Sequence, residues 1–102
     1  MKKTALSVEV ENDLDLLNDD VYDEAYKYFK LLEQDYEKYS LPLYNMDGRD
    51  LRGCRKTYFF NAEYRIVSNL ENGIISIINV IAVGKREDMQ VYKIAHQRLK
   101  QK

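Results

Sequence analysis

The sequence predicts an α/β fold of the α+β kind. Residues 1–102 are expected to form one compact domain, in which an antiparallel sheet carries N-terminal helices on one face and a short helix ends the chain. Three observations predict it. The chain has 102 residues, 45% of them hydrophobic and 32% charged, which suits one small core. Apolar residues recur at helical spacing from residue 13 to residue 40, and short β-rich segments follow from residue 54 onward.

The N-terminal segment alternates between apolar and polar residues. Leu6, Val8 and Val10 are separated by single polar residues, a period of two that is typical of a strand with one buried face. We therefore expect a first strand over residues 4–10.

An apolar stripe with steps of three or four residues follows and predicts amphipathic helix over residues 13–40. Its members are Leu14, Leu17, Val21, Ala25, Tyr28, Leu32, Tyr36 and Tyr39. Leu41-Pro42 ends the helical segment, because proline lacks the amide donor and disfavours helix in the residue before it.

Two groups of capping residues fall within this segment. Asn12 or Asp13 can cap the start of the helix, and Asp19 or Asp20 offers a second start. We therefore favour a break into a short helix and a longer one.

The second half of the chain is expected to form three antiparallel strands and a last helix. Residues 54–60, 64–70 and 74–83 are rich in β-branched and aromatic residues. Between the last two strands, Asn72-Gly73 tolerates the positive φ that a type I′ hairpin turn requires. Helical spacing returns over residues 88–99.

Charge is divided unevenly along the chain, although the net charge is only −1. Residues 1–50 contain 6 basic and 13 acidic groups, a net charge of −7, whereas residues 51–102 contain 10 and 4, a net charge of +6. A basic half in a nearly neutral protein indicates phosphate binding, although a solvated surface gives the same pattern.

Cysteine content and hydropathy indicate the compartment. Cys54 is the single cysteine, and the N-terminal residues lack the apolar run of a signal peptide. The most apolar stretch, residues 74–83, is about half the length of a membrane span. We expect a cytoplasmic protein that does not cross a membrane, with Cys54 buried as an apolar residue.

Cations recur through the predicted sheet and are accompanied by tyrosines. They are Arg52, Arg55, Lys56, Arg65, Lys85 and Arg86, with Tyr58 and Tyr92 nearby. Side chains of neighbouring strands meet on one face of a sheet, so these cations can gather around a phosphate. The alternative is that they are ordinary exposed strand charges.

Four segments resemble the RelE-type toxins of the RelE/ParE superfamily in order and spacing. They are Leu51-Arg52-Gly53-Cys54-Arg55-Lys56, Tyr64-Arg65-Ile66-Val67, Val83-Gly84-Lys85-Arg86-Glu87 and Val91-Tyr92. The resemblance covers residues 51–99. It implies a compact α/β domain whose antiparallel sheet forms the active surface, with helices packed behind it.

The resemblance also implies an activity. RelE-type toxins cleave messenger RNA in the ribosomal A site, where the 2′-hydroxyl of the RNA attacks the adjacent phosphate without a metal ion. The implied protein is thus an endoribonuclease that needs no cofactor, inhibits translation and is held inactive by a cognate antitoxin. Such a site requires a base for the 2′ proton and cations for the charge that develops on the phosphate.

The resemblance assigns a role to each matching residue. Lys56 and Arg65 would hold the phosphate, and Arg86 would stabilise the leaving oxygen electrostatically, because a guanidinium hardly deprotonates. Tyr92 would be the base, which requires neighbouring cations to lower its pKa. A wider RNA-binding set comprises Arg52, Arg55, Tyr58 and Lys85.

The sequence departs from the family pattern at one active position. Tyr58 stands where the best-studied relatives have a second lysine. Arg55 does not replace that charge in a regular strand, because neighbouring residues point to opposite faces. His96, four residues after Tyr92, is a second candidate base, although a surface histidine of the last helix explains it equally well.

Two other functions are compatible with the same fold. A ParE-like toxin would bind DNA gyrase and lack nuclease activity, and the set Lys56, Arg65, Arg86 and Tyr92 argues against it. A RelE-fold protein that has lost activity would act by binding or regulation. Tyr58 and the acidic first half favour that second alternative.

Overall fold

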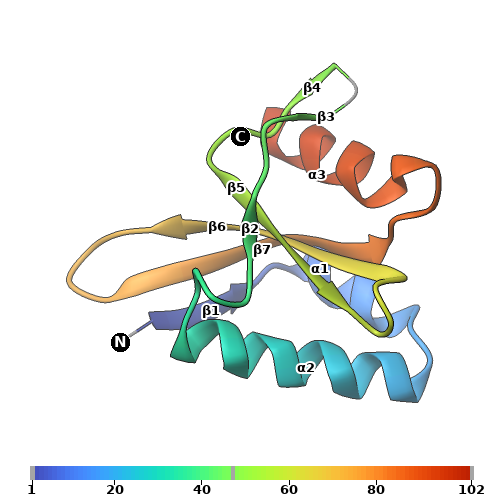
Figure 1. Ribbon diagram of the computed structural model, residues 1–102, viewed down its shortest axis with the longest axis horizontal. Coiled ribbons are helices and arrows are strands. Elements are labelled where there is room, and N and C mark those ends of the chain that lie inside the picture. The colour runs from blue at the N-terminus through green and yellow to red at the C-terminus, as the bar shows by residue number, and fades with distance from the viewer. Residues whose placement is uncertain (1, 47, 102) are drawn as a thin grey trace.

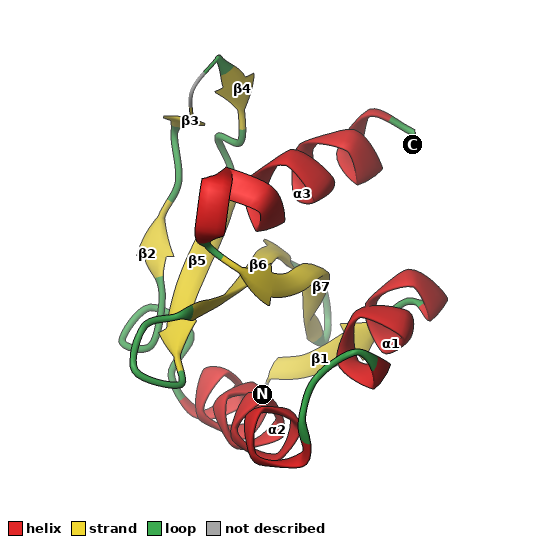
Figure 2. Cartoon of the chain, turned by 90° about the vertical axis from the view of Figure 1, so that its right-hand side faces the viewer, coloured by secondary structure: helices red, strands yellow, loops and turns green. Residues whose placement is uncertain are grey.

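The computed structural model describes residues 2–46 and 48–101, in which five strands form one sheet and helices cover both its faces (Figures 1 and 2). The elements are β1 (Lys2–Leu6), α1 (Val8–Asp15), α2 (Asp19–Gln34), β2 (Leu41–Pro42), β3 (Asn45–Met46), β4 (Arg49–Asp50), β5 (Cys54–Phe59), β6 (Tyr64–Glu71), β7 (Ser76–Lys85), a 3₁₀ turn (Glu87–Met89) and α3 (Gln90–Lys100). Helices α1 and α2 lie on one side of the sheet and α3 on the other (Figure 2). The α+β class is confirmed.

The strand order in the sheet is β1-β7-β6-β5-β2. Strands β5, β6 and β7 are antiparallel neighbours, as the sequence predicts, and β2 pairs antiparallel to β5. The sheet is nevertheless mixed, because β1 runs parallel to β7. The alternation in the sequence predicts a strand but carries no information on its direction, which here is set by the path of α1 and α2.

The expected strand over residues 4–10 ends early, and this prediction was wrong beyond Leu6. Residues 8–15 form α1, capped by Ser7, whose Oγ accepts a hydrogen bond of 3.2 Å from the amide of Val10. Val8 is 72% exposed and Val10 is buried. A serine cap with acidic residues in the first turn favours helix, and this local signal outweighs a short alternation.

The predicted break into two helices is confirmed, but both boundaries differ. Asn18, not Asp19 or Asp20, precedes α2, and its side chain makes no capping hydrogen bond. Helix α2 ends at Gln34, and turns replace the helix expected up to residue 40. Tyr36 is still buried, because its hydroxyl lies 3.0 Å from Ser68 Oγ on β6.

The hairpin between β6 and β7 does not have the type I′ turn expected from Asn72-Gly73. That turn needs positive φ at both central residues, and neither residue adopts it. Residues 72–75 instead form a longer connection between the strands. The strand pairing was predicted correctly and the turn was not.

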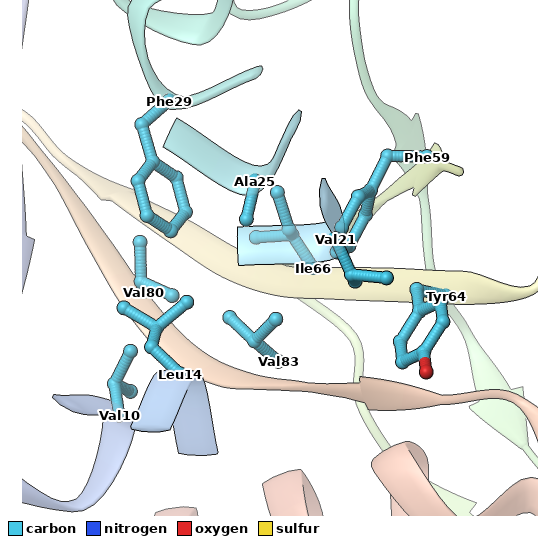
Figure 3. Close-up of a cluster of buried hydrophobic side chains, with 10 residues drawn as sticks. All are labelled: Val10, Leu14, Val21, Ala25, Phe29, Phe59, Tyr64, Ile66, Val80 and Val83. Atoms are coloured by element: carbon cyan, nitrogen blue, oxygen red, sulfur yellow. The ribbon is translucent and has the colours of Figure 1, made fainter. Parts of the chain in front are cut away.

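Two apolar cores lie on opposite faces of the sheet. The core beneath α1 and α2 contains Val10, Leu14, Val21, Ala25, Phe29, Phe59, Tyr64, Ile66, Val80 and Val83 (Figure 3). The core beneath α3 contains Leu43, Leu51, Cys54, Val67, Ile81, Ala82, Val91, Tyr92 and Ala95. Cys54 is buried, as expected. Burial on both faces explains why β7 is almost continuously apolar rather than alternating.

A bulge in β7 changes which residues face α3. Val67 pairs with Ala82 but Ser68 pairs with Val80, so Ile81 has no partner on β6. The extra residue reverses the alternation along β7. Val80 and Val83 consequently share the core beneath α1 and α2 despite their odd spacing.

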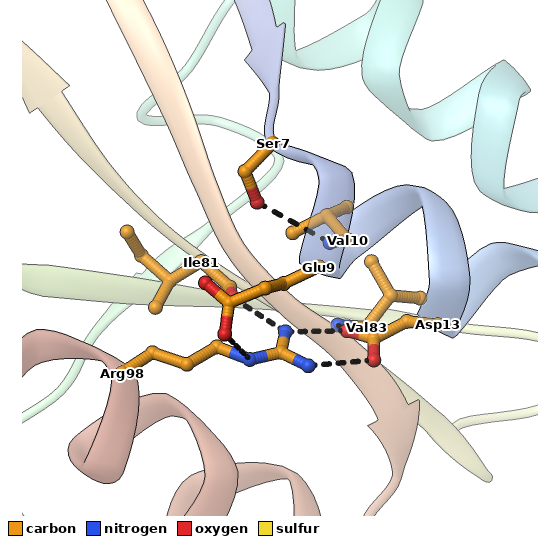
Figure 4. A network of polar contacts seen from close by, with 7 residues as sticks. All are labelled: Ser7, Glu9, Val10, Asp13, Ile81, Val83 and Arg98. Atoms are coloured by element: carbon orange, nitrogen blue, oxygen red, sulfur yellow. Dashed lines mark hydrogen bonds and ion pairs between the residues drawn. The ribbon is translucent and has the colours of Figure 1, made fainter. Parts of the chain in front are cut away.

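One ion pair connects three elements around this bulge (Figure 4). Arg98 of α3 donates two hydrogen bonds to the Asp13 carboxylate of α1, of 2.7 and 2.9 Å, and a third of 2.9 Å to the carbonyl of Ile81. The amide of Val83 donates to Asp13 over 3.1 Å. The pair therefore holds α1, β7 and α3 together at the edge of the sheet. No helix in the described residues is long and apolar enough to cross a membrane.

Candidate functional site

Strand β5 divides its side chains between the two cores, and this division creates the site. Phe59 faces the core of α1 and α2, whereas Cys54 faces that of α3. Lys56 and Tyr58 share the face of Cys54, because side chains alternate along a strand. Tyr58 is directly opposite Arg65 of β6, so the two side chains lie on the same face.

Arg65 is a buried cation, with 6% of its surface exposed. Its guanidinium carbon lies 3.8 Å from the centre of the Tyr58 ring. Its Nη1 donates hydrogen bonds to the carbonyl of Tyr64, over 3.2 Å, and to that of Ala62, while Nε has no partner among the described residues. The backbone thus fixes the guanidinium against the tyrosine ring, a cation–π contact that is strong when shielded from water.

Three of the predicted catalytic residues act electrostatically on Tyr58. Hydrogen bonding by the Lys56 ammonium lowers the pKa of Tyr58; burial opposes this, and the charges of Lys56, Arg65 and Arg86 each add a smaller lowering. The Lys56 nitrogen is 5.2 Å from the ring centre. Cations favour the phenolate over the phenol, so the pKa of Tyr58 lies below its ordinary value.

Two strained turns border the cations. Phe60, Asn61 and Ala62 have φ values of 51°, 57° and 63°, and Asp88 and Met89 have 53° and 60°. Non-glycine residues seldom adopt these values, and each costs about 1–3 kcal/mol unless its surroundings enforce it. Strain of this kind concentrates at functional sites.

A hydrogen bond connects the two strained turns. The amide of Arg86 donates to the carbonyl of Glu63 over 3.2 Å. On the other side, the Glu24 carboxylate of α2 accepts the amide of Phe60 over 2.9 Å. An open hollow lies between the turns and is lined by Glu63, Lys85, Arg86, Glu87, Asp88 and Met89. The backbone of Arg86 is thereby attached to the turn between β5 and β6, while its side chain is exposed.

Tyr92, the expected base, is buried. It is 3% exposed and packs in the core beneath α3. Such packing is the ordinary role of a tyrosine in a small core. Its catalytic role stays a prediction, and the structure does not place it among the cations around Tyr58.

Arg55 points to the opposite face of the sheet, as regular alternation predicts. Its guanidinium donates to Ser40 Oγ over 2.6 Å and to the Ser40 carbonyl over 3.0 Å. It also lies 5.7 Å from the centre of the Tyr36 ring. Arg55 therefore binds the turn after α2 to strand β5, and its side chain lies on the face of the sheet opposite Lys56 and Tyr58.

Arg52 and Lys85 also lie apart from Tyr58. Arg52 forms a two-point ion pair with Asp50, with distances of 2.8 and 2.7 Å, and holds the pKa of that carboxyl at about 2. Lys85 is opposite Tyr64 in the strand pairing and lies 5.9 Å from the centre of its ring. Of the wider RNA-binding set, Tyr58 alone joins Lys56, Arg65 and Arg86 among the described residues.

Sequence reasoning missed the central position of Tyr58, which it treated as a lost lysine. The position of Tyr58 follows from its pairing with Arg65. To predict that pairing, one must know the register of the hairpin between β5 and β6, and its turn, residues 60–63, contains no glycine to mark it. His96 is half-buried on α3, where its charge affects Asp50 rather than Tyr58. No group of three His, Cys, Asp or Glu side chains within residues 2–46 and 48–101 is arranged to hold a metal ion.

Comparison with known proteins identifies the fold. No protein-family model matches the chain, and no curated protein matches it either. The structure is similar to the toxin–antitoxin complex RelBE2 from Mycobacterium tuberculosis, with a TM-score of 0.69 and 15% identity over 82% of this chain and 96% of that chain. It is equally similar to a free mutant of the E. coli toxin RelE, with a TM-score of 0.69 and 21% identity over 95% and 96% of the two chains. The chain therefore has the fold of the RelE-type toxins, as the resemblance in residues 51–99 implies.

Proposed function

We propose that this protein is the toxin of a type II toxin–antitoxin system and acts as a metal-independent endoribonuclease on messenger RNA held by the ribosome. The observation that supports this best is that the guanidinium of Arg65 and the ammonium of Lys56 lie 3.8 and 5.2 Å from the centre of the Tyr58 ring, while Arg86 lines the neighbouring hollow. This cluster lies on paired strands β5 and β6, in a fold shared with RelE.

The cations suit the chemistry of phosphate transfer within RNA. When the 2′-oxygen attacks phosphorus and the bond to the 5′-oxygen breaks, negative charge grows on the phosphate and then on the leaving oxygen. Lys56 is half-buried and Arg86 is exposed, so both can reach a phosphate from the solvent side. Arg65, which the protein interior shields from water, supplies a fixed charge beneath them.

The proposal includes an antitoxin, mRNA and the ribosome as partners, and the cytoplasm as the place of action. One structural neighbour was solved as a toxin–antitoxin complex, which supports the first partner. The basic second half supports RNA, because backbone affinity grows with the number of cations engaged.

One observation favours a binding or regulatory protein instead. Arg65 already donates to two backbone carbonyls, and Tyr58 occupies a place that a lysine would fill in active relatives. Fewer cations then reach the RNA, and cleavage would be slow or absent.

The test measures cleavage of messenger RNA by the purified protein, with and without ribosomes, in single turnover. We expect cleavage that depends on ribosomes. Arg86→Ala should lower its rate roughly 10²–10³-fold, because this charge acts on the transition state. His96→Ala is the matched control and should change the rate less than about tenfold. No cleavage by the wild-type protein under either condition would refute the nuclease.

Expression in bacteria separates the remaining alternatives. After induction, labelled amino-acid incorporation should stop before labelled thymidine incorporation does. Early loss of DNA synthesis with intact translation would favour a gyrase-binding toxin. Normal growth would favour the regulatory protein.

A further inference from the structure

The proposed site needs a group that can accept a proton, and its cations are poorly suited to that task. Guanidinium and ammonium groups, such as those of Arg65, Arg86 and Lys56, offer hydrogen-bond donors and no acceptor. Three carboxylates, those of Glu63, Glu87 and Asp88, line the adjoining hollow with Arg86.

Tyr58 is both accessible and oriented. It is 39% exposed, compared with 3% for Tyr92, so RNA can approach its hydroxyl directly. The guanidinium of Arg65 lies against its ring at 3.8 Å, and the ammonium of Lys56 approaches at 5.2 Å. These contacts restrict the ring and place positive charge over it.

We propose that the Tyr58 phenolate is the general base of the nuclease and takes the proton from the attacking 2′-hydroxyl, an inference that rests on the proposed function. The O–H bond of the 2′-hydroxyl breaks as its proton moves to the Tyr58 oxygen. The 2′-oxygen then bonds to phosphorus and the P–O5′ bond breaks. The products are a 2′,3′-cyclic phosphate and a 5′-hydroxyl, whose oxygen takes a proton from water, and Tyr58 returns its proton to solvent.

Lys56 and Arg65 have separate duties in this scheme. Lys56 is a positioning residue, whose ammonium lies 5.2 Å from the centre of the Tyr58 ring and lowers the pKa of Tyr58. Arg65 supports the ring from beneath, and Arg86 adds charge from the turn after β7. In this scheme the base is Tyr58, at a position where the best-studied relatives have a lysine, rather than Tyr92.

The first experiment compares Tyr58→Phe with the wild type in single-turnover cleavage of ribosome-bound RNA across a range of pH. The variant keeps the ring and its contact with Arg65 but loses the hydroxyl. We expect a loss of at least about 10²-fold, the usual contribution of a general base. Tyr44→Phe, at an exposed tyrosine outside the site, should leave the rate unchanged.

The pH profile identifies the group that titrates. The wild-type rate should rise with pH up to the pKa of Tyr58, below the ordinary value of about 10 for tyrosine. Lys56→Met should shift this rise to higher pH, because it removes the main cause of the lowered pKa. Tyr58→His should restore part of the lost rate with a rise near pH 6.5, the ordinary pKa of histidine.

A titration without RNA separates this inference from the proposed function. In ¹³C-labelled protein, the ring signal of Tyr58, assigned by comparison with Tyr58→Phe, should titrate at lower pH than the ordinary value of about 10 for tyrosine. If the wild type cleaves RNA and Tyr58→Phe cleaves within tenfold of it, the base assignment is wrong while the nuclease stands. Loss of cleavage in Tyr92→Phe but not in Tyr58→Phe would likewise overturn the base assignment alone. Absence of cleavage by the wild type would overturn both, whatever the titration gives.

Discussion

Arg65 combines a structural duty with an electrostatic one. Its charge lies out of water, where interactions between charges are strong, and its Nη1 is engaged by the carbonyls of Ala62 and Tyr64. Ala62 ends the run of three left-handed residues in the turn between β5 and β6. The guanidinium thus connects this strained turn to the ring of Tyr58, and a lysine does not reproduce its planar, forked geometry.

Arg65→Ala should therefore lower stability as well as activity. Removing the guanidinium leaves the two carbonyls without their donor, which costs about 1–3 kcal/mol of unfolding free energy. Arg86→Ala is the matched control. Its side chain is exposed and its backbone amide still donates to Glu63, so it should stay within about 0.5 kcal/mol. Urea denaturation measures both, and equal stability of the two variants would show that Arg65 has no structural duty.

At the scale of elements, helix α2 is attached to the sheet by one apolar face. Val21, Ala25, Phe29 and Leu32 are buried on it, while Asp23 faces solvent. This spacing of three and four residues is the pattern seen in the sequence, although Phe29 was not part of the predicted stripe.

Val21→Asp should destabilise the domain by about 3 kcal/mol or more, because it places an unpaired charge in the core of α1 and α2. Asp23→Ala, two positions later on the same helix, should change stability by less than about 0.5 kcal/mol. Thermal unfolding followed by circular dichroism compares them. Similar melting temperatures would contradict the packing of α2 described above.

The pair of Asp13 and Arg98 should behave as one unit. The two side chains are 13% and 17% exposed, so truncating either one leaves a poorly solvated charge and should cost about 2 kcal/mol. Asp13→Ala together with Arg98→Ala should cost less than the sum of the single changes by at least about 1 kcal/mol. Glu9→Ala is the control, because Glu9 is 57% exposed and lies 3.6 Å from Arg98. Strict additivity in denaturation experiments would rule out the coupling.

At the scale of the whole molecule, the acidic helices and part of the basic half lie on different faces of the sheet, whereas Arg55 and Lys85 share the face of α1 and α2. Helices α1 and α2, with most of the acidic groups, cover one face, and Lys56 and Arg65 lie on the face of α3. Under the proposed function, RNA would approach the face that carries Lys56 and Arg65, with few cations at the point of contact.

RNA affinity should consequently depend only weakly on salt and respond to an added cation at the site. Tyr58→Lys should steepen the slope of log affinity against log salt by roughly 0.7, the value for one more phosphate contact on a single strand. Tyr44→Lys adds the same charge away from the site and should have a smaller effect. Binding of RNA that lacks the reactive 2′-hydroxyl measures affinity without cleavage. Equal salt slopes for Tyr58→Lys and Tyr44→Lys would show that RNA does not bind at Tyr58.

The candidate site was only partly predictable. Lys56, Arg65 and Arg86 were all proposed from the sequence and their catalytic roles stay predictions, whereas the contacts of Lys56 and Arg65 with the Tyr58 ring were not foreseen. Arg55 could be excluded by alternation alone. Arg52 is engaged by an ion pair with Asp50, Lys85 is turned to the other face by the bulge in β7, and Tyr92 is buried beneath α3. The spacing of residues in the sequence predicts none of these three features.

The sequence by itself determined the elements whose apolar pattern is long enough to dominate: α2, the three antiparallel strands and α3, since burying such a stripe or strand face is the main source of stability. Only the tertiary structure decided where α1 begins, which way β1 runs, and which face each side chain takes beyond the bulge at Ile81. These features arise from contacts between residues distant in the chain, such as Arg98 with Asp13 and Tyr58 with Arg65. A local pattern records what each segment must bury, whereas the partner against which it is buried is fixed only when all segments pack at once.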